Sequence, residues 1–317
     1  MSFNPQDTDF IRRHVLRSIS SNRAPGMHFA GYFLGFTPQR YATDGVEFTV
    51  AAAPHCTNAD GVVHRAALLF AADMALAAAN RVHIDPNVRT ATLMLRVEFT
   101  GEPARGTLEI SGRGSGFSPH TALPESVAAG RIVCGGREVM RMSGTWVSPP
   151  APQGMVMHGL PWEGGPDGAA LPLLKKSELE ATEKDVIRRV EKALRVAQNA
   201  DLLTSLWNPV VKRTPAGAVG KLPVGMHVGN RVGHVQGGMS LNTALVTAEA
   251  AVPEHPILTG ASAWYISPGQ GKAVTARSTI LQSGRNIAVV RTELFNAGRK
   301  LVLEVVSNHA VGARSGV

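Results

Sequence analysis

Apolar residues recur with a helical period in three parts of the chain. One helical pattern opens at Asp9 and another at Asp185, for which Thr182 is a candidate N-cap because its hydroxyl can accept a hydrogen bond from a free N–H group of the first turn. The residues after Asp185 that fall on one helical face are Val186, Ile187, Val190, Ala193, Leu194 and Ala197. Residues 66–79 are apolar on every side except at Asp73, so they predict a helix that is buried all round.

Each half also contains runs with the two-residue period of a half-buried strand. Residues 92–99 alternate between apolar and polar positions, with Thr92 on the polar side. Residues 287–295 are strand-like and end at a turn over 296–298 that signals a hairpin. The glycine-rich run 112–117 follows a β pattern and opens no helix, so we expect a strand bulge or a loop there. Strands that follow a helix without a polar face have to wrap it, which predicts a sheet around a central helix in each half.

A nine-residue signature occurs twice, 172 positions apart, and each copy runs into an alanine-rich apolar stretch. The residues that define the copies are Asn58, Gly61, His64, Arg65 and Ala66, and then Asn230, Gly233, Gln236, Gly237 and Gly238. The first copy keeps the carboxylate Asp73 but lacks the paired glycines, whereas the second keeps the glycines and has Leu245 where the carboxylate would fall. Because the copies are incomplete in complementary ways, we predict one functional site shared between two related, fused domains.

The stretch between the two copies is rich in proline and glycine and suits neither a helix nor a strand ladder. We therefore predict a first domain over 1–148, a linker over 149–174 and a second domain over 175–317. The 317 residues, 44% of them hydrophobic, suffice for two domains of ordinary size. There is no signal-peptide pattern and no apolar run of the ~20 residues that span a bilayer, so we expect a cytoplasmic protein without membrane contact.

Charge and cysteine content narrow the classes of partner. The net charge of +8 suits an anionic partner, and by itself it is compatible with nucleic acid, with a phosphorylated small ligand or with a merely basic surface. Aromatic residues are only 5% of the chain and no dense basic run is present, which disfavours nucleic acid. Cys56 and Cys134 lack metal-ligand spacing, so we expect neither a disulfide framework nor a metal site.

Two features carry candidate chemistry. A carboxylate such as Asp73 on a buried helix is costly to desolvate, so it is either satisfied by a neighbouring backbone group or arginine, or it opens onto a functional cleft. Gly237 and Gly238 precede the equivalent helix, where N–H groups carry partial positive charge and a backbone without side chains can approach a ligand closely. That arrangement suits a developing oxyanion, although a Gly-Gly pair alone is most often just a turn.

Together these residues resemble the hot-dog thioesterases of the phenylacetate and 4-hydroxybenzoyl-CoA type. Their signature is Asn-x-x-Gly-x-φ-His-Gly-Gly, where φ is apolar, with an acidic residue nine positions after the His. Asp73 lies nine positions after His64, and the second copy matches with Gln236 in place of the His. The resemblance covers most of both halves and implies an α+β tandem hot-dog fold, in which each antiparallel sheet wraps a central helix and sites lie between the two units.

Carried over residue by residue, the resemblance implies one competent site. Asp73 would activate water or attack directly, Thr92 would position the water or the carboxylate, and the Gly237 N–H would polarise the thioester carbonyl. Asn230, Gln236 and Gly238 would contact the substrate. Gln236 for His removes a titratable group but keeps a donor and an acceptor. A reciprocal site of Asn58, His64 and Arg65 facing Leu245 would be inactive.

The function implied is hydrolysis of an acyl-CoA-like thioester by a homo-oligomer, with no metal or cofactor and no nucleic-acid or membrane partner. Two alternatives remain open. A hot-dog hydratase or dehydratase would use an Asp-x-x-x-x-His pair, and the only such spacing is Asp9 to His14, far from the signature. A non-catalytic acyl-CoA binder or sensor would gain little from a buried carboxylate. The acyl specificity cannot be inferred from the sequence. Glu249, in the second half, is expected at a solvated or helix-end position.

Overall fold

The computed structural model of the protein describes residues 3–118, 120, 122–152, 154–164 and 172–312. Helices and strands occur in the same order in both halves. The first half has α1 (Pro5–Asn22), α2 (Phe29–Leu34), β1 (Thr37–Ala42), β2 (Gly45–Val50), α3 (Arg65–Arg81), β3 (Ala91–Phe99), β4 (Leu108–Ser118), β5 (Glu125–Cys134) and β6 (Arg137–Val147). The second half has α4 (Ala181–Val196), α5 (Leu202–Trp207), β7 (Val210–Thr214), β8 (Gly217–Pro223), α6 (Gly237–Ala251), β9 (Ile257–Tyr265), β10 (Ala273–Ser283), β11 (Ile287–Asn296) and β12 (Leu301–Ala310). Short 3₁₀ helices are η1 (Pro161–Glu163), η3 (Lys176–Glu178) and η4 (Met226–Val228).

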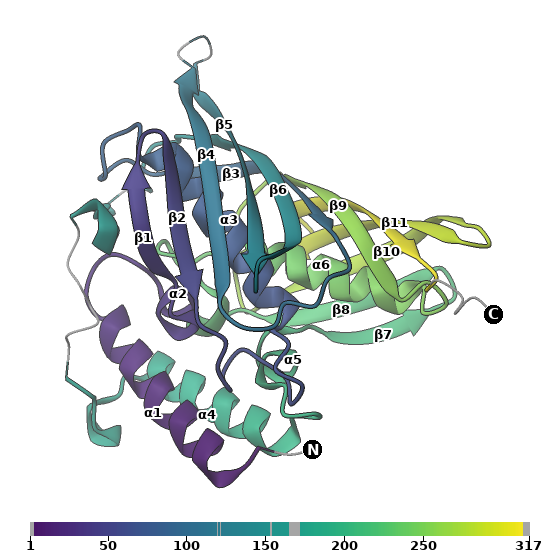
Figure 1. The fold of residues 1–317 in the computed structure, drawn as a ribbon, viewed down its shortest axis with the longest axis horizontal. Helices are drawn as coiled ribbons and strands as arrows, with labels where there is room; N and C mark the ends of the chain where they lie inside the picture. Colours follow the sequence, from purple (N-terminus) through teal and green to yellow (C-terminus); the bar gives the residue numbers. More distant parts are fainter. Residues whose placement is uncertain (1–2, 119, 121, 153, 165–171, 313–317) are drawn as a thin grey trace.

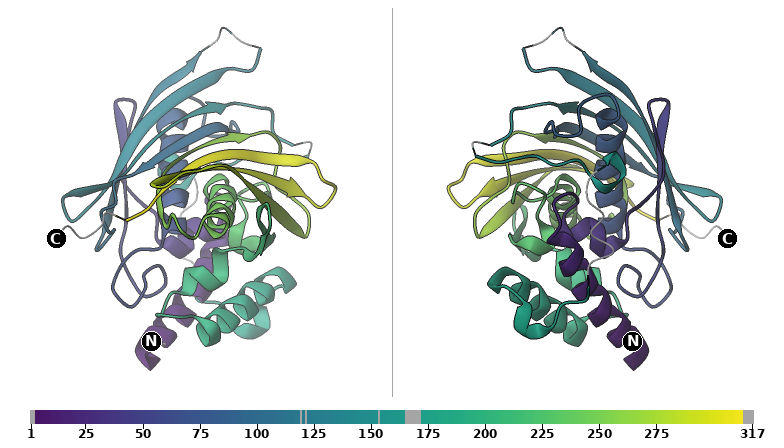
Figure 2. Two further views of the ribbon diagram at one scale, coloured as in Figure 1. Left: turned by 90° about the vertical axis from the view of Figure 1, so that its right-hand side faces the viewer. Right: turned by 90° about the vertical axis from the view of Figure 1, so that its left-hand side faces the viewer.

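The strands in the described part of the chain form one twelve-stranded antiparallel sheet in the order β1-β2-β4-β5-β6-β3-β9-β12-β11-β10-β8-β7. Each half contributes six neighbouring strands, and the second half repeats the order of the first in reverse, as a pseudo-two-fold axis between β3 and β9 requires. The halves are joined there by pairs such as Met94 with Trp264. The sheet curves around α3 and α6 (Figures 1 and 2). This is a tandem hot-dog fold, so the predicted fold class is confirmed.

The central helices lie close to the sheet because small residues meet at the crossings. A Cβ added at Gly114 in β4 would collide with the carbonyl of Ala79 in α3, and one at Gly112 would come within 3.3 Å of the Ala75 carbonyl. α3 itself is buried almost all round, as predicted for residues 66–79. The glycine-rich run 112–117 lies in β4, which has a register shift between Gly114 and Phe117, so the expected bulge is confirmed.

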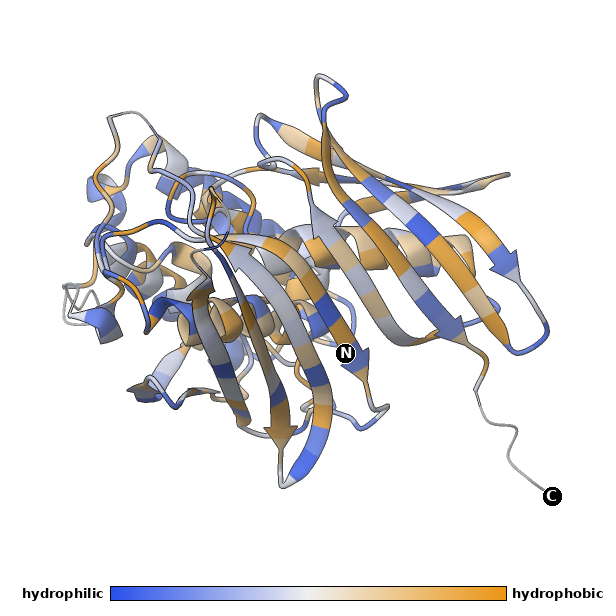
Figure 3. Cartoon of the chain, turned by 90° about the horizontal axis from the view of Figure 1, so that it is seen from above, coloured by the Kyte–Doolittle hydropathy of each residue, from blue (hydrophilic) through white to orange (hydrophobic). Residues whose placement is uncertain are grey.

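The strands separate a buried face from an exposed one. In β3, Leu95 and Val97 are buried against the central helices, whereas Arg96 and Glu98 point outward. Figure 3 shows the same alternation as hydrophilic and hydrophobic bands along the strands. The period of two in the sequence therefore identifies which side of each strand faces the core.

Helices α1 and α4, the first helix of each half, pack against one another outside the sheet (Figure 1). The guanidinium of Arg12 donates to both carboxylate oxygens of Glu191 at 2.7 and 2.8 Å. The predicted N-cap at Thr182 is wrong, because α4 begins at Ala181. Glu183 accepts instead from the backbone N–H of Glu180 at 2.7 Å, and Arg23 holds that carboxylate in place.

The predicted linker 149–174 includes 153 and 165–171, which lie outside the described residues. In the described part of this stretch, the short 3₁₀ helix η1 is the regular secondary structure. The boundaries 1–148, 149–174 and 175–317 therefore stay predictions. Among the described helices, none combines the length and the apolar character needed to cross a bilayer.

Candidate active site

Asp73 lies in the middle of α3 and is only 6% exposed. Its Oδ1 accepts a hydrogen bond from the Thr92 hydroxyl at 2.7 Å, and its Oδ2 accepts one from the Gln236 amide at 2.6 Å. The Gly238 N–H also donates to this carboxylate. Burial raises the pKa of Asp73 to about 6, against the hydrogen bonds from Thr92 and Gly238, which lower it. The carboxylate therefore has hydrogen-bond donors for both oxygens, and its pKa lies close to neutral pH.

Thr92 reaches Asp73 because β3 is irregular. Regular alternation would place Thr92 on the outer face with Met94 and Arg96, as the sequence pattern implied. The pairing of β3 with β6 shifts register between Thr92 and Met94, and this turns Thr92 inward. A bulge of this kind re-aims a single side chain without moving the rest of the strand.

Gln236 is the N-cap of α6 and connects the two halves. Its Oε1 accepts from the Met239 N–H at 3.0 Å, while its Nε2 donates to Asp73. An amide can perform both tasks at once because it carries a fixed donor and a fixed acceptor. The helix cap and the contact with Asp73 therefore fix one orientation of this side chain.

Gly237 is the first residue of α6, so its N–H is not used within the helix. A Cβ at this position would come within 2.6 Å of Asp73 Oδ2, which explains why no larger residue fits. The hydroxyl of Tyr265 donates to the Gly237 carbonyl at 2.9 Å. Burial, and next the charge of Asp73, raise the pKa of Tyr265 well above its ordinary value, so this phenol stays a donor. Tyr265 was missed in the sequence because nothing marks a tyrosine at the end of a strand.

A cavity of about 470 Å³ opens beside these groups and takes its walls from both halves. Among the described residues that line it, Asp73 is the only carboxylate, whereas Arg81, Arg89 and Arg231 line it as well. Apolar wall residues include Met74, Ala77, Trp146, Met157, Leu160 and Val302. The cavity therefore combines an apolar interior with a positive charge excess, as a ligand with an acyl chain and phosphates would require.

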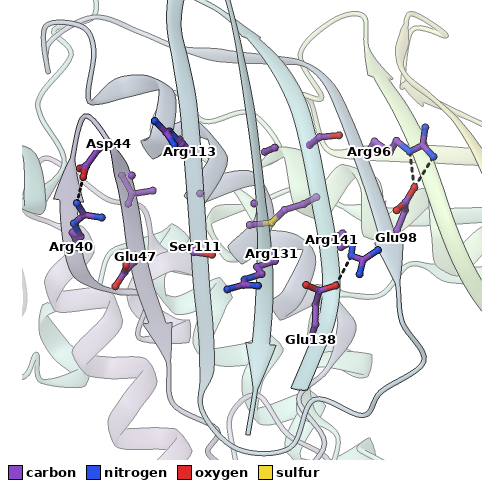
Figure 4. A pocket seen from close by; sticks show the side chains of 17 residues that line it. Arg40, Asp44, Glu47, Arg96, Glu98, Ser111, Arg113, Arg131, Glu138 and Arg141 are labelled. Carbon is purple, nitrogen blue, oxygen red and sulfur yellow. Dashed lines mark hydrogen bonds and ion pairs between the residues drawn. The ribbon is translucent and has the colours of Figure 1, made fainter. Parts of the chain in front are cut away.

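A larger hollow, of about 640 Å³, lies on the outer face of the first half of the sheet (Figure 4). Its lining is rich in charged side chains, several of which pair with one another, such as Arg96 with Glu98 at 2.6 Å. None of the predicted site residues lines it. Charged pairs on the solvent side of a sheet are ordinary, so we do not assign the function to this hollow.

The signature asparagines shape the loops before the central helices. Asn230 Oδ1 accepts from the N–H groups of Val232 and His234, both at 3.0 Å, and Asn58 holds its own loop in the same way. Asn230 also lines the cavity, but its carbonyl oxygen is engaged within the loop. Gly238 does not line the cavity; a Cβ there would collide with the Leu69 carbonyl, so this glycine permits the crossing of α3 and α6.

The reciprocal position is built differently. Leu245 and Leu258, the second residue of β9, are buried where the other half has Asp73 and Thr92, the second residue of β3. Arg65 occupies the first position of α3 and forms an ion pair with Glu249, whose Oε2 lies 2.7 Å from the guanidinium. Glu249 stands in the last turn of α6, a helix-end position as expected, but it is paired and not simply solvated.

His64 serves a structural role at the same position. Its Nδ1 caps α3 by accepting from the Ala66 N–H at 3.0 Å, and its Nε2 lies 3.2 Å from the hydroxyl of Thr204. Burial lowers the pKa of His64 to about 4, despite the opposing charge of Asp201. The reciprocal position thus lacks the carboxylate, and Arg65 stands at the helix start where the other position has Gly237.

Comparison with known proteins agrees with this fold. The family model described as the acyl-CoA thioesterase N-terminal domain matches residues 228–310, which run from η4 to the end of β12. No curated protein matches the chain at significant sequence similarity. Residues 228–310 are therefore similar to an acyl-CoA thioesterase domain, and the whole described chain has the tandem hot-dog fold.

Solved structures share the architecture along nearly their whole length. A protein of Lactobacillus plantarum, provisionally assigned as an oleoyl thioesterase, has a TM-score of 0.55 at 14% identity, covering 86% of this chain and 98% of that one. The 12:0-ACP thioesterase of Umbellularia californica has a TM-score of 0.51 at 12% identity, covering 84% and 93%. A provisionally assigned thioesterase II of Thermobifida fusca has a TM-score of 0.50 at 12% identity, covering 92% and 100%. At these identities the likeness concerns the fold.

Proposed function

We propose that the protein hydrolyses an acyl-CoA thioester at a single site formed by Asp73 and Thr92 of the first half with Gln236 and Gly237 of the second. The observation that carries this proposal is the position of Asp73. A buried carboxylate with three donors lies in a cavity against the N-terminus of α6, where the Gly237 N–H can receive an oxyanion.

In this mechanism the thioester carbonyl oxygen accepts a hydrogen bond from the Gly237 N–H. Asp73 removes a proton from water while the water oxygen bonds to the carbonyl carbon, and the tetrahedral intermediate then expels the CoA thiolate. The thiolate takes the proton from Asp73, which restores the carboxylate. Thr92 and Gln236 fix the orientation of Asp73 by hydrogen bonds to its two oxygens. Direct attack by Asp73 would give an anhydride that water hydrolyses, and the same residues serve both routes.

The acyl-CoA substrate also accounts for the charge of the cavity. Arg89 and Arg231 line it, and burial lowers the pKa of Arg231 to about 10, which still leaves it cationic at neutral pH. We assign these two arginines to the CoA phosphates, which guanidinium groups bind through paired hydrogen bonds. We also expect chains to associate in solution, which light scattering after size-exclusion chromatography measures directly.

The test of the proposal is release of free CoA thiol from short, medium, long and aromatic acyl-CoAs by the wild type and by Asp73→Asn. We expect turnover by the wild type on at least one ester and a loss of at least 100-fold in kcat for the variant, with folding retained. Equal turnover by the two proteins would refute the role of Asp73. Tight stoichiometric binding of acyl-CoA without any turnover would support a binding protein instead.

The position of His14 argues against the hydratase alternative. His14, half of the Asp9–His14 pair, lies in α1, does not line the cavity, and its Nε2 is 2.6 Å from the Phe33 carbonyl. The rings of Phe10 and His55 pack against it, so it belongs to the packing of α1. Two other histidines, His28 and His234, line the cavity with Asp73, but neither has the Asp-x-x-x-x-His spacing to Asp73.

A further inference from the structure

The segment between the two halves contributes to the cavity wall. We name residues 155–163 the strap. Met157 and Leu160 of the strap are 8% and 3% exposed, and both line the same cavity as Asp73. Their neighbour Met155 is 38% exposed and does not line this cavity. Two apolar side chains of an irregular segment are thus buried at the site, whereas the residue beside them is not.

A buried ion pair fixes the strap to the first half. Arg81, at the end of α3, donates from Nε and from a terminal guanidinium nitrogen to the two carboxylate oxygens of Glu163, at 2.7 and 2.8 Å. Both side chains are almost fully buried, and the Tyr41 hydroxyl donates to the same carboxylate at 2.9 Å. Glu163 also accepts from the Leu160 N–H at 2.8 Å, so the anchor directly positions Leu160. Buried charges arranged like this hold one conformation, because separating them leaves an unpaired charge in a dry site.

The strap is also fixed to the second half. Arg231, in the loop before α6, donates to the His158 carbonyl at 2.6 Å. On the side of the first half, Trp162 packs edge-on against Phe36 and Phe48, with ring centroids 5.8 and 5.0 Å away. The strap therefore bridges the two halves beside the cavity, with Leu160 between the attachments at His158 and Glu163 and Met157 directly before the first of them.

The wall that faces the strap is apolar along α3. Asp73, Met74, Ala77, Ala78 and Arg81 line the cavity and follow one side of the helix. Asp73 and Arg81 are eight residues apart, which is about 12 Å along a helix axis. Since Glu163 neutralises Arg81, the stretch that leads away from Asp73 offers apolar surface to a ligand. Met157 suits such a wall because its unbranched side chain adapts to the shape beside it.

We propose that the strap sets the length and bulk of the acyl group that the site accepts, with Met157 and Leu160 in contact with the acyl chain. This inference rests on the proposed function for the position of the thioester at Asp73. It assigns acyl selectivity to residues between the hot-dog domains and not to the domains alone.

The experiment measures binding, so that it does not depend on turnover. S-alkyl-CoA thioethers of increasing chain length, which cannot be hydrolysed, are titrated calorimetrically into the full-length wild type, Met157→Ala, Met157→Trp and the control Met155→Ala. Each methylene buried in an apolar wall changes affinity about fourfold. We expect Met157→Ala to favour chains two or three methylenes longer by at least tenfold, and Met157→Trp to weaken the longest chains that the wild type binds by at least tenfold. Met155→Ala should keep the wild-type profile.

Leu160→Ala is a second variant with the same expected direction as Met157→Ala, and thermal unfolding of each protein shows which variants are folded. An unchanged chain-length profile in folded Met157→Ala and Met157→Trp would overturn the proposal. A shift of the same size in Met155→Ala would overturn it as well, because that residue does not line the cavity. Thiol release from the matching acyl-CoAs tests the proposed function separately, since a protein without turnover can still show the altered binding profile.

Discussion

Asp73 illustrates the cost of burying a carboxylate in a core. A carboxylate buried in an alanine-rich helix is stable only because Thr92, Gln236 and the Gly238 N–H donate to it. Its pKa of about 6 lies above the value of about 4 in an unfolded chain. The contribution of Asp73 to stability is therefore fully present below about pH 4 and is lost as the pH rises through about 6. The ionised form, which the proposed reaction requires, is the less stable one.

The same pKa predicts how activity depends on pH. Since Asp73 acts as a base only when ionised, kcat/KM should rise with pH to a plateau above its pKa of about 6 and fall about tenfold per pH unit below it. Gln236 does not titrate, so position 236 adds no second limb. Initial rates between pH 4.5 and 8.5 measure the profile, provided that the protein stays folded over that range. A rate that is flat from pH 5 to 8 would contradict the assignment of Asp73 as the base.

At the scale of elements, the site depends on where a helix begins and where a strand is irregular. α6 begins at Gly237, which places a free N–H group and the N-cap Gln236 against α3. The register shift in β3 brings Thr92 to the inner face. Each device acts locally, yet the site needs both because the groups belong to different halves of the chain.

Gly237→Ala tests the beginning of α6. The added Cβ would come within 2.6 Å of Asp73 Oδ2, so we expect the carboxylate to be displaced and kcat to fall by about 100-fold or more. Gly298→Ala is the matched control, because a Cβ there meets nothing within 4 Å. Steady-state kinetics and circular dichroism of both variants measure the effect. Wild-type kcat in folded Gly237→Ala would show that the close approach of this backbone to Asp73 is not needed.

At the scale of the molecule, duplication has produced two unequal positions. Apolar Leu245 and Leu258 replace Asp73 and Thr92 in the reciprocal position, and Arg65 is engaged with Glu249. The ion pair between Arg65 and Glu249 connects the first turn of α3 with the last turn of α6, whereas the other position has Gly237 at its helix start. The reciprocal position therefore contributes to the contact between the halves.

The asparagine pair provides a test of this asymmetry. Each asparagine accepts two backbone N–H bonds in its loop, so Asn58→Ala and Asn230→Ala should each destabilise the fold by about 1–3 kcal/mol. Only the Asn230 loop presents Gln236 to Asp73. We expect turnover per folded molecule to stay within twofold of wild type in Asn58→Ala and to fall at least tenfold in Asn230→Ala. A collapse of turnover in folded Asn58→Ala would mean that the reciprocal position is catalytic.

The sequence by itself determined the repeated order of elements and the buried helix at residues 66–79. It also determined that one copy of the signature keeps the carboxylate and the other keeps the paired glycines. These follow from local periodicity and from residue types that are expensive to bury, such as Asp73 in an apolar helix. Tertiary structure alone decided the orientation of Thr92, since a one-residue irregularity in pairing reverses a side chain without any mark in the pattern. It also decided the bond from Tyr265 to Gly237 and the burial of Met157 and Leu160 at the site, because those contacts join segments far apart in the chain.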